Sequence, residues 1–451
     1  MSNGDASASS WSSDSSSCWD DWPADFDGTG LFQSLDRDEP PIFRFDVQRV
    51  LMEVEGQLKS AVVDIPKVGK GSNYFGMHLR LANGSDVLVR MARRDVNWPR
   101  HTEGDADEIL KLVKQQVLEV QFEAEIYRLL RSHREILASN LLYYRAATYR
   151  PNSVSPPQDV LGRALFVFQK TEGVNNVWPD DLDKRLHILE QCARIRAALF
   201  SFVLPPDFVA SWLARRIPCA RSIPAHMITP TRDFALRLLS AKINETIPDQ
   251  GGLIGWEEDH HVVGPNALRA KMLLLQLLPL VMPPEGGCDN NIYRLVLDHG
   301  DFGIHNMTIT DAPPTITSLY DWEAAEIVPA ILSDPQMSVY VDLELNGDGL
   351  PAISRVWEEI TKEDRVDCLR YAEHYFHVLD ERAPHYMRAI KAAKDARHIW
   401  FALKSWRGDD PEQYFGALGS WAEERMSEVL SVEAPKSNRV LESCAPRHEM
   451  L

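Results

Sequence analysis

Cysteine is scarce in this chain of 451 residues, and both long apolar runs and an excess of positive charge are missing. The six cysteines include no C-x-x-C pair, so neither a zinc ribbon nor a disulfide framework is indicated. The strongest apolar stretch, residues 272–282, is too short for a bilayer and contains Gln276 and Pro279. No basic segment followed by an apolar run opens the sequence. We therefore expect a cytoplasmic protein with no membrane partner.

Positive charge is in deficit, with 48 Lys and Arg against 66 Asp and Glu and a net charge of -18. This balance argues against nucleic acid or an acidic membrane leaflet as the main partner, because like charges repel. A cationic or metal-chelated ligand fits better. Residues 1–38 carry eight Asp and one Arg, so the rest of the chain is only mildly acidic.

The two ends of the chain have the composition of disordered tails. Residues 1–38 are rich in Ser and Asp and contain too little apolar surface to fold alone, and residues 432–451 are similar. The aromatic residues of the first tail leave open a second interpretation, in which this segment docks on a partner or on the folded body: Trp11, Trp19, Trp22 and Phe26. Between the tails, 44% hydrophobic and 25% charged residues are typical of a packed globular protein.

Hydrophobic periodicity predicts two domains, residues 39–170 and 171–431. The first domain reads as a helix over 43–60, three short strands within 61–94, a helix over 107–132 and a buried strand over 165–168. Asn83-Gly84 is a strong turn signal between the second and third strands, so a small antiparallel sheet is expected. The second domain is mostly helical in pattern. Its exception is residues 294–322, which read as strand, loop, strand, Pro-Pro turn and strand.

Polar residues gather at the ends of the strands in residues 294–322. A strand runs into His299-Gly300-Asp301, Asn306 follows five residues after the aspartate, and the last strand ends at Asp321-Trp322-Glu323. A carboxylate at the start of a tight loop can meet a substrate hydroxyl, while an amide oxygen at its end faces a metal. Asp321 can supply a charged oxygen to the same hard cation. The plainer alternative is a turn in which Asp301 caps a loop and His299 is a core histidine.

This pattern resembles the catalytic core of the aminoglycoside phosphotransferase and choline kinase group, relatives of protein kinases, whose own pattern is H-R-D, four residues, N, then D-F-G. The resemblance implies an α+β, two-lobed, protein-kinase-like fold with a small antiparallel-sheet N-lobe and a mainly helical C-lobe. It implies that Asp301 orients or deprotonates an acceptor hydroxyl and that His299 braces the loop. It further implies that Asn306 and Asp321 hold Mg²⁺ on the phosphates of ATP.

The first domain contains a candidate loop over the nucleotide phosphates. Between its first two strands, glycines allow backbone N–H groups to approach phosphate closely, although an ordinary glycine-rich hairpin is the commoner explanation. The candidate residues of this loop are Gly69, Gly71, Ser72 and Asn73.

The resemblance also calls for a strand cation paired with a helix carboxylate. Arg90 occupies the cation position, where Arg offers a planar fork and Lys a point charge. We expect Glu125 to be its partner by resemblance, although helical geometry does not separate it from Glu123. Gln169 and Thr171 lie where the resemblance places the segment that grips adenine, and an ordinary buried strand is the alternative.

Carboxylates beyond Asp321 are candidates to select an amine substrate, namely Glu323 and Glu326, with Asp334 further on. Residues 257–261 contain acids and histidines, but consecutive side chains diverge and a charged surface loop is expected. Arg93, Arg94 and Arg100 form a small basic cluster for which a solvated face is the default.

The leading hypothesis is a kinase that uses ATP and Mg²⁺ to phosphorylate a hydroxyl of a small molecule, for which a cationic compound is one candidate. The alternative is a nucleotide-binding pseudokinase or scaffold that keeps the fold without turnover, suggested by Arg90. A protein kinase is third, because Gly300 replaces the Arg of H-R-D and no A-P-E signature follows Asp321 convincingly.

Overall fold

The computed structural model describes residues 47–93, 106–148, 160–249, 260–285, 292–356 and 361–433. The chain divides into two compact units, one of residues 1–124 and 140–170 and the other of residues 125–139 and 171–451. Residues 125–139 therefore belong to the second unit, which differs from the expected N-lobe of residues 39–170. The reason is main-chain pairing with a distant residue of the second unit, since Ser139 N–H donates to Leu319 O at 3.0 Å and Leu319 N–H donates to Leu137 O at 2.8 Å. Both predicted tails lie outside the described residues, apart from the last turn of a helix that ends at Glu433.

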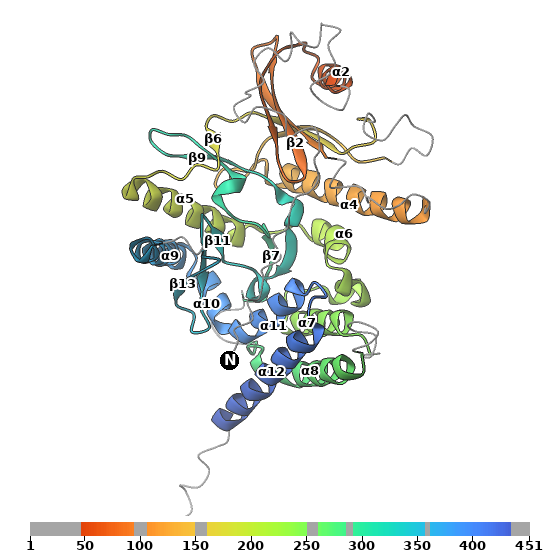
Figure 1. Cartoon of the computed structure of the whole chain (residues 1–451), viewed down its shortest axis with the longest axis vertical. Helices are drawn as coiled ribbons and strands as arrows, with labels where there is room; N and C mark the ends of the chain where they lie inside the picture. The colour runs from red at the N-terminus through yellow and green to blue at the C-terminus, as the bar shows by residue number, and fades with distance from the viewer. Residues whose placement is uncertain are drawn as a thin grey trace, which may run out of the picture. The chain divides into compact units, whose positions relative to one another are not determined.

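The first unit is built on an antiparallel sheet of five strands in the order β1-β2-β3-β5-β4 (Figure 1). This unit has the expected antiparallel sheet, with β4 as a strand that we did not predict. The strands are β1 (Val62–Lys70), β2 (Tyr74–Leu81), β3 (Asp86–Ala92), β4 (Leu141–Arg145) and β5 (Leu165–Gln169). The predicted turn between β2 and β3 is present, with Gly84 N–H donating to Leu81 O at 2.9 Å.

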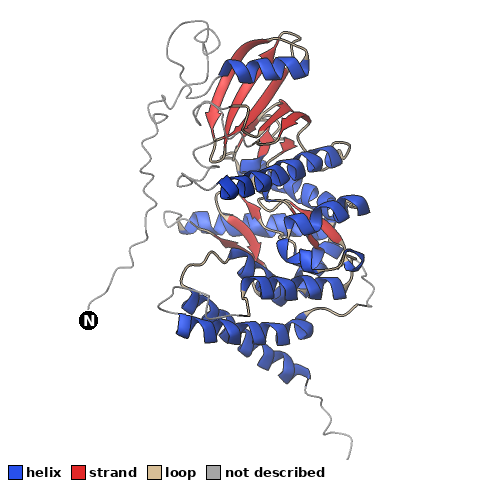
Figure 2. Ribbon diagram, turned by 90° about the vertical axis from the view of Figure 1, so that its right-hand side faces the viewer, coloured by secondary structure: helices blue, strands red, loops and turns tan. Residues whose placement is uncertain are grey.

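Alternation along the strands gives the sheet two different faces. One face carries Met77, Val89 and Val167, which are buried together with the apolar stripe of helix α2 (Val47–Leu58). Figure 2 shows this helix lying across the strands. The predicted helix over residues 43–60 is thus observed over Val47–Leu58, while residues 43–46 lie outside the described residues, and its stripe is buried: Val47, Val50, Leu51 and Val54. The residues between those positions of β3, including Arg90, point to the opposite face.

Helix α4 (Ala106–Leu130) corresponds to the helix predicted over residues 107–132. Phe122 and Ile126 of the predicted stripe are fully buried, whereas Leu118 and Leu129 are only half-buried.

The second unit is mainly helical, as expected (Figure 1). Its helices are α5 (Leu182–Ser201), α6 (Pro206–Arg216), α7 (Arg232–Thr246), α8 (His260–Val281), α9 (Lys362–Arg382), α10 (Pro384–Ala392), α11 (Lys394–Ser405) and α12 (Pro411–Glu433). Helix α12 packs closely on α8, because a side-chain carbon at Gly419 would lie 3.5 Å from the Cα of Ala270. The predicted fold class, α+β with a small antiparallel sheet and a mainly helical part, is confirmed.

Short strands between the helices carry the predicted motifs. Residues 294–322 contain the three expected strands, β7 (Leu295–Asp298), β8 (Met307–Ile309) and β9 (Ile316–Leu319). The other strands of this unit are β6 (Val174–Asn175), β10 (Glu326–Pro329), β11 (Met337–Ser338), β12 (Asp342–Leu345) and β13 (Pro351–Ser354). They form the sheets β6-β8-β9, β10-β7 and β11-β12-β13. We did not predict the last of these sheets.

Within the described ranges, no one helix has the length and apolarity needed to cross a bilayer. Helices α5 and α6 together meet that criterion of length and composition, and they are bent by 105° at the break between them.

Candidate active site

The site is built on the loop between β7 and β8, which is anchored at its first residue. Asp298 ends β7 and is buried, and its Oδ1 accepts a hydrogen bond from Arg196 Nη1 at 3.1 Å. Its Oδ2 accepts the main-chain N–H of Asp334 at 2.6 Å. A buried ion pair with further hydrogen bonds holds its neighbours in one geometry, since breaking it would leave an uncompensated charge. The chain therefore leaves β7 in a defined direction.

The carboxylate of Asp301 is held on one side only. Its Oδ2 accepts hydrogen bonds from His305 Nε2 at 3.0 Å and from Asn306 Nδ2 at 3.1 Å. The hydrogen bond from His305 is the main cause that lowers the pKa of Asp301 below its usual range. The side chain is 53% exposed, so it is an ionised and accessible hydrogen-bond acceptor at neutral pH. A carboxylate with a lowered pKa is a weak proton acceptor and is suited to orienting a hydroxyl.

Asn306 is oriented by the same loop. Its Nδ2 donates to the main-chain oxygen of Asp301 at 2.8 Å as well as to the carboxylate, so both amide hydrogens are used. Its Oδ1 accepts no hydrogen bond within the described part of the chain. The residue is 4% exposed. The amide oxygen is therefore fixed in orientation and available to a ligand.

His299 connects this loop to the strand that carries Asp321. The ring is fully buried, lies 4.5 Å from the ring of Trp322, and places Nε2 3.1 Å from Tyr320 O. Burial, with a smaller effect of Arg196, lowers the pKa of His299 to about 4. The ring is therefore neutral, and it binds the carbonyl oxygen by carrying its hydrogen on Nε2. His299 braces the loop as expected. A buried ring cannot touch a substrate, so His299 is a positioning residue of the catalytic loop.

Asp321 lies beside Asn306 because β8 and β9 pair in register. Met307 is opposite Leu319, and one step further Tyr320 N–H donates to Asn306 O at 3.0 Å. Asp321 has φ +69° and ψ +62°, the left-handed region, which is uncommon for a residue other than glycine. Its main-chain N–H donates to Tyr127 Oη at 3.0 Å. The structure thus brings Asp301, Asn306 and Asp321 to one end of one hairpin.

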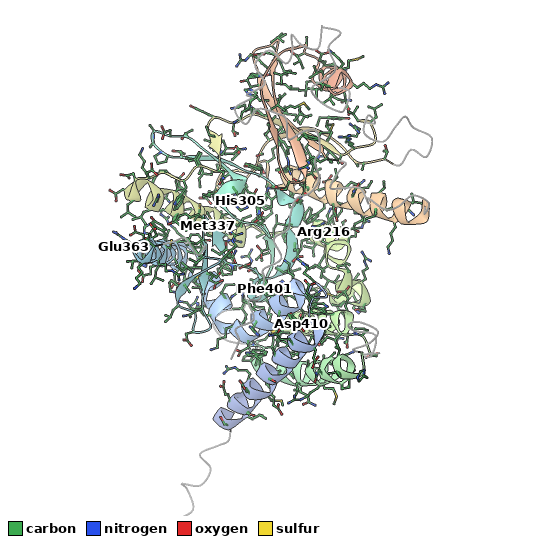
Figure 3. All side chains as sticks on the ribbon, viewed as in Figure 1. Arg216, His305, Met337, Glu363, Phe401 and Asp410 are labelled. Carbon is green, nitrogen blue, oxygen red and sulfur yellow. The ribbon has the colours of Figure 1, made fainter. Side chains whose placement is uncertain are left out.

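The segment after Asp321 is fixed by a residue that sequence reasoning missed. Arg216 Nη2, at the end of α6, donates to Glu323 O at 2.6 Å and to Ala325 O at 3.3 Å. Figure 3 labels Arg216 and His305 on the ribbon of this unit. Because Arg216 binds main-chain oxygens, it holds the short helical turn that follows Asp321, whatever the side chains of that turn are.

The residues present suit a hard divalent cation. An amide oxygen from Asn306 and a carboxylate from Asp321 are the oxygen ligands that Mg²⁺ prefers, and Mg²⁺ usually binds one or two protein groups and takes the remainder from phosphates and water. No group of three or more His, Cys, Asp or Glu that could form a protein-only metal site occurs among the described residues. The donor set therefore fits a metal that arrives with a phosphate ligand.

In the first unit, the strand cation is paired with a different glutamate from the one expected. Arg90 Nη1 lies 3.2 Å from Glu123 Oε1, and both side chains are buried. Glu125 instead pairs with Arg128 at 2.5 Å and is 39% exposed. Our choice of Glu125 is therefore wrong, because two residues along a helix rotate the side chain by about 200° and only Glu123 faces the sheet.

The guanidinium of Arg90 also stacks on an aromatic ring. It lies 4.3 Å from the ring centroid of Tyr74 and 5.9 Å from that of Phe166. The planar fork of an arginine can pair with a carboxylate and lie on a ring at once, whereas the ammonium of a lysine is a point charge. The arginine at this position is therefore part of a built arrangement in the first unit.

The candidate phosphate loop is the turn between β1 and β2. Gly71 N–H donates to Tyr74 O at 2.8 Å, which closes the hairpin. Arg93 Nη1 donates to Gly71 O at 2.7 Å and to Ser72 O at 3.1 Å, and Arg93 N–H donates to Asn73 O at 2.9 Å. The candidates Gly71, Ser72 and Asn73 thus lie in this turn, whereas Gly69 lies in β1 opposite Gly76 of β2. Arg93, which we expected on a solvated face, binds that turn.

Four other predicted residues have protein partners. Gln169 Oε1 accepts a hydrogen bond from Asn140 at 2.9 Å, and Thr171 Oγ1 donates to Ser318 Oγ at 3.2 Å. Glu326 is ion-paired with Lys404 at 2.8 Å, so its charge is compensated within the protein, which argues against its predicted role in selecting an amine. Glu323 offers its main-chain oxygen to Arg216. Of the basic cluster, Arg94 and Arg100 lie outside the described residues, as do residues 257–259 of the acidic group.

No protein-family model matches this chain, and no curated protein matches it. Solved structures align with it at low similarity. A putative aminoglycoside phosphotransferase from Ralstonia eutropha is 12% identical, with 85% of this chain and 99% of that chain covered and a TM-score of 0.40. A macrolide 2'-phosphotransferase type I is 12% identical, with coverages of 84% and 96% and a TM-score of 0.36. An ethanolamine kinase from Plasmodium vivax is 12% identical, with 81% of each chain covered and a TM-score of 0.35. Similarity at this level does not assign a reaction, which must be argued from the side chains.

Proposed function

We propose that the protein is a phosphotransferase that moves the γ-phosphoryl group of ATP to a hydroxyl of a small molecule. The observation that carries the proposal is the arrangement around Asp301. An exposed, ionised carboxylate shares its loop with an amide whose hydrogens are fully used and whose oxygen is available. Asp321 approaches the same place from the next strand.

Each candidate residue of the second unit has a separate role in phosphoryl transfer. Asp301 accepts a hydrogen bond from the acceptor hydroxyl and aligns its oxygen for attack. Its lowered pKa favours orientation over early proton removal, which suits a loose transition state that needs little base catalysis. Asn306 and Asp321 would hold Mg²⁺, and the bound ion would neutralise charge on the phosphates. His299 and Arg216 keep the two segments in place.

The first unit supplies a cation and a turn suited to phosphate. Arg90 carries a guanidinium, the group that can bind phosphate oxygens in pairs, and Glu123 holds it in place. The turn of Gly71, Ser72 and Asn73, with Gly69 in the adjoining strand β1, has short side chains that leave the main chain open to the approach of a phosphate. We propose that both contact the nucleotide.

A small-molecule acceptor is favoured over a protein by the H-G-D pattern, in which Gly300 stands where the protein-kinase pattern has Arg. The net charge of -18, of which -7 lies in residues 1–38, favours a cationic acceptor, and Glu323 remains a candidate to bind it. Glu326 is less suitable, because Lys404 already compensates its charge.

A second candidate function is nucleotide binding without turnover. Arg90 favours it, because its guanidinium is buried, paired with Glu123 and stacked on Tyr74, an arrangement that also serves as structure alone. A pseudokinase of this kind binds Mg-ATP and transfers nothing.

A thermal-shift titration with Mg-ATP, combined with an ATP-consumption assay over a broad panel of alcohols, separates these functions. Ligand at 100 times its dissociation constant should stabilise the protein by about 2.7 kcal/mol. Stabilisation that Asp321→Asn weakens, together with consumption of ATP in the presence of an acceptor, supports the phosphotransferase. Stabilisation without consumption supports the pseudokinase, and no stabilisation contradicts both.

A further inference from the structure

His305 and Asp301 form a pair within the candidate catalytic loop. The ring Nε2 lies 3.0 Å from Asp301 Oδ2, and the His305 side chain is 36% exposed. The main chain at His305 is fixed as well, because Tyr320 Oη donates to His305 O at 2.7 Å. This histidine had no role in the sequence pattern, which used only the residues on either side of it.

The His305 ring packs against the main chain at Gly303, in the space that a side chain at position 303 would fill. A side-chain carbon at Gly303 would overlap Cε1 of the His305 ring and lie 2.6 Å from its Nδ1. It would also lie 2.9 Å from Ser338 O on the other side. The φ of Gly303 is -157°, ordinary extended backbone, so the glycine is not required by backbone conformation. It is required by space, because the imidazole ring occupies the place where a side chain would begin.

The two carboxylate oxygens of Asp301 therefore differ in their hydrogen bonds. Oδ2 accepts from both His305 and Asn306, whereas Oδ1 accepts no hydrogen bond within the described residues. The χ2 torsion of an aspartate is broad and nearly two-fold, so a carboxylate on an exposed loop would otherwise rotate. Asn306 donates one amide hydrogen to Oδ2 and the other to the main-chain oxygen of Asp301, so His305 is the second of the two donors that fix the carboxylate.

We propose that His305, seated on Gly303, is a positioning residue that locks the Asp301 carboxylate so that Oδ1 is presented to the acceptor hydroxyl. This inference deepens the proposed function and rests on it. The loop then carries its own orienting donor, and the geometry of the base does not depend on the acceptor. An acceptor of any class meets the same oxygen.

Two substitutions of His305 isolate the hydrogen bond from the packing. His305→Phe keeps a ring on Gly303 and removes the donor, whereas His305→Gln removes the ring and keeps an N–H donor at a similar reach. A misplaced reacting group costs up to about 100-fold in rate. We expect His305→Phe to lower kcat by roughly 10- to 100-fold with the KM for ATP unchanged, and His305→Gln to recover most of that loss.

The measurement is kcat and the KM for ATP of the full chain, with Asp301→Asn beside the two His305 variants and thermal midpoints for all of them. Activity in the wild type, loss in Asp301→Asn, loss in His305→Phe and recovery in His305→Gln support the inference. Wild-type activity that Asp301→Asn abolishes and His305→Phe leaves intact overturns the role of His305 alone. Equal loss in His305→Phe and His305→Gln also overturns it, since packing would then explain the effect. A wild type with no activity on any acceptor overturns the proposed function and this inference together.

Discussion

The Cα atom of Gly300 lies against the peptide group of Ala324 so closely that a side-chain carbon at position 300 would overlap the carbonyl oxygen and lie 2.7 Å from the carbonyl carbon. Gly300 also has φ +78°, in the left-handed region that favours glycine. The loop that carries Asp301 and the segment that follows Asp321 are therefore in main-chain contact. Gly300 occupies the position of the arginine in the H-R-D pattern, and in this chain any side chain at that position would collide with the main chain of Ala324.

Substituting Gly300 should cost far more than backbone conformation alone explains. Gly84 is a matched control, since its φ is +83° and a side-chain carbon there would have no atom within 4 Å. We expect Gly84→Ala to lower the free energy of unfolding by about 1 kcal/mol, the cost of an alanine in the left-handed region. Gly300→Ala adds a clash with main chain that cannot move cheaply, so we expect a larger loss and little activity. Urea unfolding of both variants measures the difference, and equal losses would refute the contact.

The two glutamates of α4 should behave oppositely. Glu123→Ala leaves the Arg90 guanidinium buried without its carboxylate, and removing one partner of a buried pair costs about 3–5 kcal/mol. Glu125→Ala breaks an exposed pair with Arg128 and should cost about 0–1 kcal/mol. Urea unfolding and Mg-ATP titration of each variant test this. A loss of nucleotide affinity in Glu125→Ala, with Glu123→Ala unaffected, would restore the original choice of partner.

His299 should make the protein sensitive to acid. Burial lowers its pKa to about 4 from 6.5, so the unfolded chain takes up the proton first as the pH falls. The stabilisation is complete above pH 6.5, is lost between pH 6.5 and pH 4, and at pH 5 the loss is about 2 kcal/mol. His299→Gln keeps a donor for Tyr320 O and removes the titration. The difference in free energy of unfolding between pH 7 and pH 5 should be smaller in this variant than in the wild type; identical differences would contradict the assignment.

Arg216 should matter for activity although it touches no substrate. Arg216→Ala frees the main-chain oxygens of Glu323 and Ala325, which loosens the turn behind Asp321. We expect turnover to fall by about 10-fold and the Mg²⁺ concentration for half-maximal activity to rise, because misplaced ligands bind metal less well. Arg215→Ala is the neighbouring control, since Arg215 is exposed and lies over the ring of Trp212. If both variants respond alike to Mg²⁺, Arg216 has no special effect on the metal ligands.

The sequence was sufficient to predict those elements whose structure is determined by contacts between residues close together in the chain. The alternation of β2 and β3, the Asn83-Gly84 turn and the 3.6-residue stripe of α2 are each set by neighbours in the chain, and they were predicted. The link between Asp301 and Asn306 spans five residues and follows from one loop. His305 lies in the same loop. The sequence signal that could have indicated its positioning role is Gly303, a glycine two residues before a residue with a ring.

Contacts between distant residues were not predictable from one sequence. Arg196 binds Asp298 across 102 residues and Arg216 binds Glu323 across 107, and nothing in the local pattern marks either arginine. Helical periodicity placed both Glu123 and Glu125 beside the apolar stripe, and only the position of β3 decides between them. The strands β12 and β13 are a different kind of miss, because Asp342–Leu345 alternates polar and apolar residues and Asn346-Gly347 follows it as a turn signal, so a hairpin could have been predicted here.

The central claim is that Asp301, Asn306 and Asp321 form a site for phosphoryl transfer. Its most direct test follows the γ-phosphoryl group of ATP by ³¹P NMR in the presence of Mg²⁺ and a mixture of small alcohols and amino alcohols, for the wild type and for Asp301→Asn. We predict a new phosphate-ester signal that grows as the γ-phosphate signal falls, and its loss in Asp301→Asn with ATP binding retained. An ester that forms equally fast in Asp301→Asn, or a wild type that binds Mg-ATP and yields no ester from any acceptor, would contradict the claim.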